Sequence, residues 1–262
     1  MPSEQATNQS VERAVVVLRA LAEGQSERRV SDVAASAGLG PSTTSRLLAT
    51  LEQLDLVERD PVSNLYRLSL GTAPLAAVAL NRHPVHRASR MVLQELATST
   101  GLGANIAVRR GDRLMFLCNF EGARAPKTYT QAGHTAPLHA TAIGKCLLSA
   151  LTGEERRALL GDELVAHTEY TVTGHAGLDA AVTQVRRSGY AVEVEERALG
   201  RASLAAPVLD ADGSVAGALS LWGPVSALLG TPIGDAAAQP PEGLVRQVIE
   251  TADAVSQAMG AH

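Results

Sequence analysis

Apolar residues recur every three or four positions over three short segments at the start of the chain, and this spacing predicts three helices. The first begins at Ser10, a good N-cap, and its apolar face consists of Val11, Ala14, Val15, Leu18 and Leu21. The second begins at Ser31 and ends at Gly38, because glycine accepts the left-handed conformation of a helix C-terminus. Pro41 opens the third at the position where a missing N–H costs nothing. Two short helices joined by a tight glycine-containing turn are typical of a helix-turn-helix.

The third helix carries the candidate functional residues of this region. Its core stripe consists of Leu47, Leu48, Leu51 and Leu54. Short hydroxyls and one arginine precede the first carboxylate, Glu52. A helix N-terminus attracts phosphate through its free N–H groups, and hydroxyls and a guanidinium extend that capacity into a DNA groove. We therefore expect Ser42 to contact phosphate and Thr43, Thr44 and Arg46 to touch base edges or nearby phosphates.

A β-hairpin is predicted directly after the third helix. Its turn lies at residues 60–64, DPVSN, between two short apolar runs. This is the wing of a winged helix, in which Arg59 and Arg67 can reach backbone phosphate. A protein-interaction module fits the composition equally well, since residues 1–80 contain seven Arg and nine Asp or Glu, a net charge of −2. DNA binding is favoured because the acidic residues fall mainly outside the acid-free face.

The remaining pattern predicts a connector and a larger domain. Residues 70–82 form an apolar helix that a second copy of the chain could bury through Leu75, Val78 and Ala79. Thereafter helices and strands occur together: strands at 104–110, 114–120, 190–194, 204–209 and 215–222, with helices at 85–99, 141–151, after Thr152, around 178–185 and at 242–259. Strands in sequence-adjacent pairs indicate an α+β domain with a mainly antiparallel sheet. The predicted domains are 1–69, a linker helix at 70–84, and 85–262.

Length and composition limit the class of protein but do not identify a reaction. The 262 residues are long enough for about two domains. With a net charge of −4, the chain as a whole does not attract a polyanion such as DNA, so any DNA contact must come from a local surface. Cys118 and Cys146 are expected to be small core residues in a reducing compartment. No signal peptide is visible, and glycines and prolines interrupt the uncharged stretch 213–234, so we expect no membrane contact and a cytoplasmic location.

Three segments of the chain together resemble the IclR family of bacterial transcriptional regulators. They are SDVAASAGLGPSTTSRLLATLEQLDLVERDP, PLHATAIGKCLLSAL and GYAVEVEERALGRASLAAPVLDADGSVAGALSLWGP. The resemblance implies an N-terminal winged helix, a dimerising linker helix and a C-terminal GAF-like domain that binds a small effector. It also implies a homodimer, or a dimer of dimers, that represses or activates a metabolic operon from a double-stranded DNA operator. The effectors implied are organic acids, aromatics or sugar-derived molecules.

The same resemblance assigns an effector pocket residue by residue. Ala142 and Ile143 match the backbone-donating turn, and the other pocket positions are Glu193, Ser203, Ser220 and Trp222. Glu193 is expected either to bind a hydroxyl or amine of the effector or to pair with an arginine such as Arg201.

This sequence departs from the family at four places. Asp55 stands where glycine is usual, Ser203 replaces a frequent cysteine, and Trp222 occupies the place of a small residue. The tryptophan either shrinks the pocket or offers a stacking surface to a flat ligand. The stretch 226–241, rich in Ala, Gly and Pro, is expected to be a mobile loop.

We find no sequence motif that predicts enzymatic activity. No G-x-S-x-G occurs, and His139 and Cys146 stand where a P-loop needs Gly and Ser or Thr. We interpret His83 and His86 as surface or linker residues, and Glu195 and Glu196 as a solvated loop edge. We therefore expect no catalytic residues, no metal site and no cofactor. The prediction is a ligand-responsive, DNA-binding regulator; the alternative is a small-molecule sensor whose helix-turn-helix contacts a protein.

Overall fold

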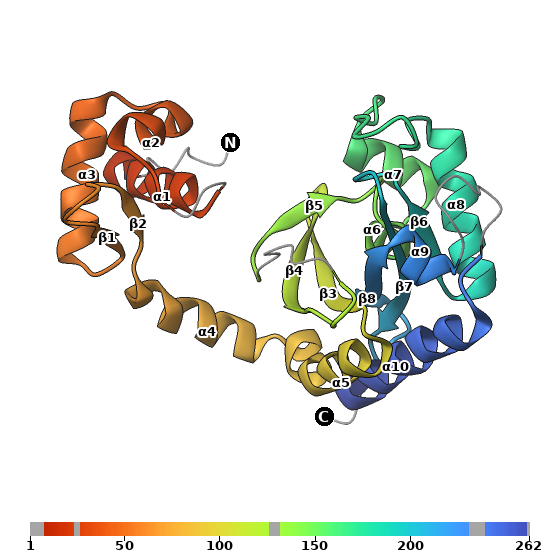
Figure 1. Cartoon of the computed structure of the whole chain (residues 1–262). Helices are drawn as coiled ribbons and strands as arrows, with labels where there is room; N and C mark the ends of the chain where they lie inside the picture. Colours follow the sequence, from red (N-terminus) through yellow and green to blue (C-terminus); the bar gives the residue numbers. More distant parts are fainter. Residues whose placement is uncertain (1–7, 24–26, 126–131, 231–238, 261–262) are drawn as a thin grey trace. The chain divides into compact units, whose positions relative to one another are not determined.

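The computed structural model describes residues 8–23, 27–125, 132–230 and 239–260 (Figure 1). The chain divides into two compact units, Met1–Ala79 and Leu80–His262. The boundary lies inside the predicted connector. Each unit has its own buried core.

The first unit contains the predicted helix-turn-helix, in α1 (Gln9–Ala22), α2 (Val30–Ala37) and α3 (Pro41–Gln53). Gly38 ends α2 in the left-handed conformation, with φ at 62°, and Pro41 opens α3, as the sequence predicts. The two N-caps differ from the prediction. The side chain of Asn8 accepts from Ser10 N, so Asn8 caps α1. In α2 the helix begins one residue earlier, and Ser31 lies within its first turn.

The predicted wing is present as β1 (Val57–Arg59) and β2 (Tyr66–Leu68), which pair antiparallel. Arg28 forms a further backbone bridge to Tyr66. Asp55 adopts the left-handed conformation, with φ at 56°. Aspartate tolerates this region better than most residues, and its Oδ1 accepts from Ser69 Oγ at 2.6 Å. The turn geometry that glycine would permit is therefore kept with a different residue.

The connector is helical, as predicted. A 3₁₀ turn, η1 (Leu70–Thr72), leads into α4 (Ala73–Arg82), and α5 (Pro84–Thr100) begins after His83. Leu75 and Val78 are 67% and 60% exposed in the single chain. His86 is not the surface residue that the sequence predicted. It lies in the first turn of α5 and is buried, with only 7% of it exposed.

The second unit is built on a six-stranded antiparallel sheet in the order β5-β4-β3-β8-β7-β6 (Figure 1). Its strands are β3 (Gly103–Arg110), β4 (Arg113–Phe120), β5 (Thr135–Pro137), β6 (Ala191–Val194), β7 (Arg201–Leu209) and β8 (Val215–Pro224). Side chains alternate between the two faces of a strand, and both faces of this sheet are covered by helices. The predicted α+β class with an antiparallel sheet is confirmed.

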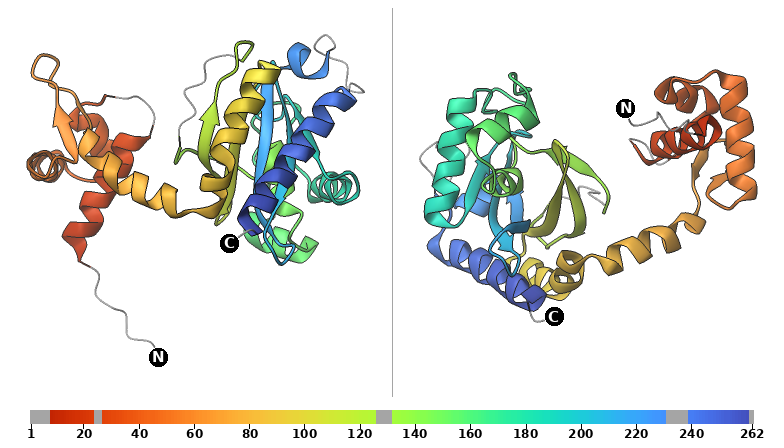
Figure 2. Two further views of the ribbon diagram at one scale, coloured as in Figure 1. Left: turned by 90° about the horizontal axis from the view of Figure 1, so that it is seen from below. Right: turned by 180° about the vertical axis from the view of Figure 1, so that it is seen from behind.

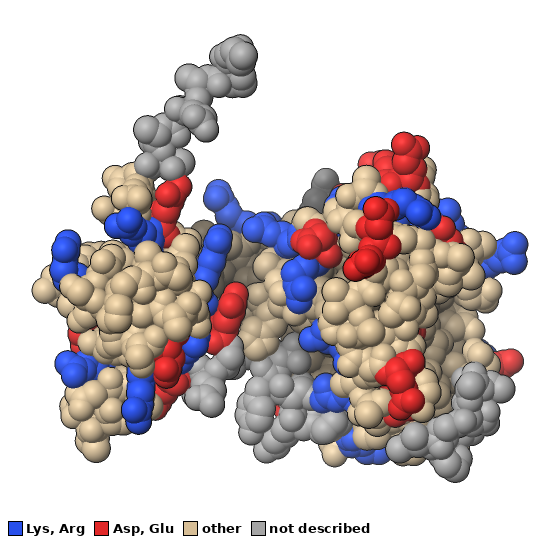
Figure 3. All heavy atoms as spheres, turned by 90° about the horizontal axis from the view of Figure 1, so that it is seen from above, with Lys and Arg blue, Asp and Glu red and all other residues tan. Residues whose placement is uncertain are grey.

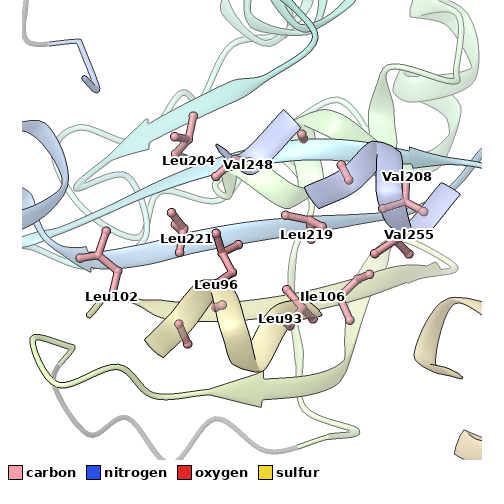
Figure 4. Close-up of a cluster of buried hydrophobic side chains, with 14 of the residues drawn as sticks. Leu93, Leu96, Leu102, Ile106, Leu204, Val208, Leu219, Leu221, Val248 and Val255 are labelled. Carbon is pink, nitrogen blue, oxygen red and sulfur yellow. The ribbon is translucent and has the colours of Figure 1, made fainter. Parts of the chain in front are cut away.

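On one face of the sheet lie α5 and α10 (Glu242–Gly260), side by side in both views of Figure 2. The apolar core beneath them is shown in Figure 4, where Leu93 and Leu96 of α5 and Val248 and Val255 of α10 meet the strands. On the other face a second core packs under α6 (Ala142–Leu148) and α8 (His175–Ser188). This second face also holds the cavity described below.

Two short elements are absent from the sequence prediction. They are β5 and α9 (Val225–Leu229). The prediction of a mobile loop at 226–241 is wrong for its first residues, because they belong to α9, in which Leu228 and Leu229 are buried. Residues 231–238 lie outside the described residues.

The predicted capping box of α7 (Gly153–Leu160) is present, with Thr152 and Glu155 exchanging hydrogen bonds. Among the described residues, no helix combines the length and apolar character that a membrane span needs.

Candidate functional site

The exposed side of α3 carries three of the predicted DNA-contacting residues. Ser42 and Arg46 are exposed and Thr43 is half-buried. The first turn contains no acidic residue. Charged side chains of both signs are interspersed over the face seen in Figure 3, in keeping with the small net charge. The absence of carboxylates from α3 ahead of Glu52 is therefore the electrostatic feature that favours an anionic partner at the N-terminal part of this helix.

The prediction for Thr44 is wrong. Its side chain is fully buried, and Oγ1 donates to the carbonyl oxygen of Gly40 at 3.1 Å. The reason is its place on the helix, because residues at i, i+4 and i+7 share a face. Thr44 precedes the core residues Leu48 and Leu51 by four and seven positions, so it belongs to the apolar stripe. The sequence spacing of Thr44, Leu48 and Leu51 therefore indicated that Thr44 is buried, and the argument from residue type overlooked it.

The two wing arginines have partners within the first unit. Arg59 Nη2 donates to Asn64 Oδ1 at 2.7 Å, and its guanidinium lies over the Tyr66 ring. Arg67 pairs with Glu58 and Glu27, and these two carboxylates raise its pKa, Glu58 most. Both guanidinium groups are thereby oriented at the wing. A phosphate that binds Arg67 has to compete with two carboxylates.

The second unit contains a cavity of about 360 Å³. Its wall is formed by side chains from β3, β4, α6, β6, β7 and β8 and from the segments that precede α6, α8 and β7: Asn105, Leu114, Phe116, Thr141, Ile143, His167, Glu193, Arg197, Ala198, Arg201, Ala202, Ser203, Ser220 and Trp222. The strand register explains how they meet. Gly103, Trp222, Ser203 and Glu193 lie directly opposite one another across β3, β8, β7 and β6.

Five of the six predicted pocket residues line this cavity. They are Ile143, Glu193, Ser203, Ser220 and Trp222. The side chain of Ala142 does not reach the cavity, because it is fully buried in the core beneath α6. The first-turn N–H groups of a helix lack intrahelical partners, and Thr141 satisfies one of them by accepting from Gly144 N.

Glu193 is held inside the protein by three hydrogen bonds. Its Oε1 accepts from the backbone N–H groups of Glu196 (2.7 Å) and Arg197 (3.2 Å), and its Oε2 accepts from Ser203 Oγ (2.9 Å). Burial raises the pKa of this carboxyl to about 7, although the hydrogen bonds from Ser203 and Arg197 oppose the rise. Of the two expected roles, pairing with Arg201 is not observed.

Trp222 is fixed by its neighbours. The indole Nε1 donates to Asn119 Oδ1 at 3.1 Å, and the guanidinium of Arg201 lies over the ring, 5.3 Å from its centroid. Gly103 lies opposite it on β3, where a Cβ would overlap the indole. The absence of a side chain at Gly103 thus leaves the space that this tryptophan occupies.

The expectation that Glu195 and Glu196 form a solvated edge is wrong. Both are buried, at 6% and 7% exposure. Glu196 forms an ion pair with Lys145 of α6, and Glu195 Oε1 accepts from Gly200 N at 2.6 Å. Glu195 also has a φ of 58°. These carboxylates organise residues 195–200, the segment that presents Arg197 and leads to Arg201.

Asn105, His167 and Arg197 are among the polar residues of the wall that sequence reasoning missed. Asn105 accepts from Ser220 Oγ at 2.8 Å, and its place in the apolar run Ala104–Val108 could have drawn notice. His167 stacks on His139 with ring centroids 5.7 Å apart, and burial lowers its pKa, followed by the charge of His139. Arg197 follows the glutamate pair in an irregular segment. Neither of the last two carries a signal in its local sequence.

Comparisons with known proteins agree with the division of the chain into two units. The model of the IclR helix-turn-helix domain matches residues 10–61, and that of the bacterial transcriptional regulator IclR C-terminal domain matches residues 77–257. The chain is 32% identical to the HTH-type transcriptional regulator XynR of Escherichia coli over 214 residues, covering 81% of this chain and 85% of that protein. It is 32% identical to the glycerol operon regulatory protein of Streptomyces griseus over 253 residues, covering 97% of each.

Among solved structures, an IclR transcriptional regulator from Alicyclobacillus acidocaldarius superposes with a TM-score of 0.82 at 27% identity, covering 97% of this chain and 100% of that one. Both family models match, and the two sequence relatives are operon or transcription regulators by name. The chain therefore belongs to the IclR family of bacterial transcriptional regulators, with a helix-turn-helix domain and an effector-binding domain.

Proposed function

We propose that this regulator contacts its operator through Ser42, Thr43 and Arg46 of α3, with Arg59 and Arg67 on the backbone beside the wing. The observation that carries the proposal is the acid-free N-terminal part of α3, ahead of Glu52, where Ser42 and Arg46 are accessible. Hydroxyls and N-terminal N–H groups suit phosphate oxygens, and arginine suits a guanine edge. Thr44 has no part in the contact because it is buried.

In the second unit, the proposed effector site is the cavity bordered by Glu193, Ser203, Ser220 and Trp222. Its volume of about 360 Å³ lies in the range of small-molecule pockets. The wall combines polar and charged side chains with apolar ones, so it can hold an organic molecule by both hydrogen bonds and apolar contacts. The effector is an organic acid, an aromatic or a sugar-derived molecule, and its binding changes operator affinity. The regulator acts as a homo-oligomer in the cytoplasm.

Replacing Arg46 tests the DNA-contacting face. Arg46→Ala removes one exposed guanidinium from α3, so operator affinity should fall by about 1–3 kcal/mol. Fluorescence anisotropy with labelled DNA from upstream of the protein's own gene measures the change. Arg19→Ala, which removes an exposed arginine from α1, is the matched control and should bind like the wild type.

Circular dichroism, to which the helices of the first unit contribute, checks that both variants stay folded. Equal DNA affinity for Arg46→Ala and the wild type would refute the assignment. Specific binding of a protein in place of DNA would favour the sensor alternative.

A further inference from the structure

Resting on the effector-binding function proposed above, we infer that Arg201, positioned by Trp222, is the anion-recognising group of the cavity and that the effector is a small carboxylate. The inference concerns the chemical class of the effector. It follows from the strand register, from the charges around the cavity, and from the apolar part of its wall.

The register places Arg201 where its side chain can cover the indole. Ser203 on β7 lies opposite Trp222 on β8, and Arg201 precedes Ser203 by two residues, so it projects from the same face of the sheet. Diagonal neighbours in a sheet are within reach of long and aromatic side chains. The guanidinium accordingly lies over the Trp222 ring, 5.3 Å from its centroid.

The placement of Arg201 Cζ over the Trp222 ring is compatible with N–H donors that remain available to a ligand. A guanidinium that stacks on an aromatic ring through its flat face keeps its N–H groups at the edge, where they match the two oxygens of a carboxylate. The ring beneath it is itself immobilised by the hydrogen bond from Nε1 to Asn119 Oδ1 and by its contact with Gly103. Trp222 is thus a positioning residue, and its indole face is occupied by Arg201. This arrangement disfavours the expected role of Trp222 as an open stacking surface for a flat ligand.

The charges around the cavity favour an anion. Arg197 and Arg201 both line it, and neither forms an ion pair with a described residue. Arg113 lies close enough to lower the pKa of Arg197, after the effect of burial. The one carboxyl in the wall, Glu193, directs both oxygens to Ser203 and to backbone N–H groups. A pKa of about 7 also reduces its negative charge at neutral pH.

The remaining wall suits a compact organic body. Leu114, Phe116 and Ile143 contribute apolar surface. The hydroxyl of Ser220 donates to Asn105 Oδ1, so part of the polar wall is already satisfied within the protein. A small acid can therefore place its carboxylate at Arg201 and its apolar portion against these side chains.

The test compares acids with their neutral amides. Isothermal titration calorimetry with the full-length protein measures the affinities of two matched pairs, benzoate with benzamide and nicotinate with nicotinamide. We expect the wild type to bind at least one carboxylate about tenfold or more tightly than its amide, because hydrogen bonds to a charged acceptor are the stronger ones. Arg201→Gln should abolish this preference, whereas Arg110→Gln, a change at an exposed arginine of β3, should keep it.

Two variants of Trp222 separate positioning from folding. Trp222→Phe keeps a ring beneath Arg201 and should retain most of the carboxylate-to-amide affinity ratio, whereas Trp222→Leu should reduce it. Circular dichroism of each variant should match the wild type. The inference is overturned if neither acid binds, if the amides bind equally well, or if Arg201→Gln keeps the preference.

Measurements of operator binding distinguish a failure of the carboxylate assignment from a failure of the proposed effector-binding function. An amide that binds both the wild type and Arg201→Gln and alters DNA affinity would overturn the carboxylate assignment while retaining the effector site. Loss of ligand binding in Arg201→Gln with unchanged DNA affinity in the absence of ligand supports the inference.

Discussion

Glu193 shows how one buried residue links the cavity to the surrounding backbone. Its carboxylate receives hydrogen bonds from Ser203 on β7 and from the N–H groups of Glu196 and Arg197. The neighbouring Glu196 is itself paired with Lys145. A change in the charge of Glu193 therefore acts directly on the segment that carries Arg197.

Glu193 should make the stability of the second unit depend on pH. Its pKa rises from the usual 4.5 to about 7 through burial, so the folded chain holds this proton more tightly than the unfolded chain. The favourable contribution is complete below pH 4.5 and is lost as the pH rises through 7. Between pH 5.5 and 8, wild type should lose roughly 2 kcal/mol more unfolding free energy than Glu193→Gln.

Urea unfolding followed by Trp222 fluorescence measures this difference, because the single tryptophan reports the second unit. The nearby charges of Glu196, Lys145 and Arg197 are common to both proteins, so comparison with the variant isolates Glu193. Parallel stability curves for the two proteins would contradict the assignment.

At the residue scale, helix and strand periodicity predict burial better than residue type does. Thr44 follows the spacing of Leu48 and Leu51 and is buried despite its hydroxyl. Glu195 and Glu196 are buried because Gly200 N and Lys145 satisfy them, and these partners are unrelated to any local pattern. Tertiary partners of this kind explain why the cavity was predicted only in part.

At the scale of elements, α6 depends on a close approach of backbone to backbone. A Cβ at Gly144 would overlap the carbonyl oxygen of Leu138. Gly243 in α10 is also helical, but a Cβ there would meet open space. The two glycines therefore make a matched pair.

Gly144→Ala should destabilise the second unit by roughly 2–3 kcal/mol, since overpacking forces the backbone to shift. Gly243→Ala should leave the unfolding free energy unchanged or raise it by up to about 1 kcal/mol, because alanine is the better helix former. Urea unfolding monitored by Trp222 fluorescence measures both. A neutral Gly144→Ala would show that α6 does not require this contact.

The longer elements were predictable because their patterns are strong. Gly38 and Gly189 end helices in the left-handed conformation, and the alternation within β7 and β8 matches the two faces of the sheet. Weak patterns failed: β5 has three residues, and α9 has five in a run rich in Ala and Gly. Helices and strands this short depend on packing against the sheet more than on their own sequence.

At the scale of the whole molecule, the exposed apolar side chains of α4 bear on assembly. Leu75 and Val78 are three residues apart and therefore share a helix face. Exposed apolar residues in such a pattern favour burial by a second copy of the chain. This interface is the one we propose for the homo-oligomer.

Val78→Asp should shift the protein towards the monomer, because the interface would bury an unpaired carboxylate. Ala77→Asp places the same charge on another side of α4 and should leave the assembly unchanged. Size-exclusion chromatography with light scattering gives the mass of each. An unchanged mass for Val78→Asp would exclude this face as the interface.

The central claim is that the exposed side of α3 binds DNA, and the salt dependence of binding to the upstream region tests it most directly. Each phosphate neutralised contributes about −0.9 to the slope of log Kobs against log salt concentration. The account predicts a steep linear fall for the wild type and a shallower one, by about one unit, if Arg46→Ala loses a phosphate contact. Absence of binding, or binding that does not respond to salt, would contradict it.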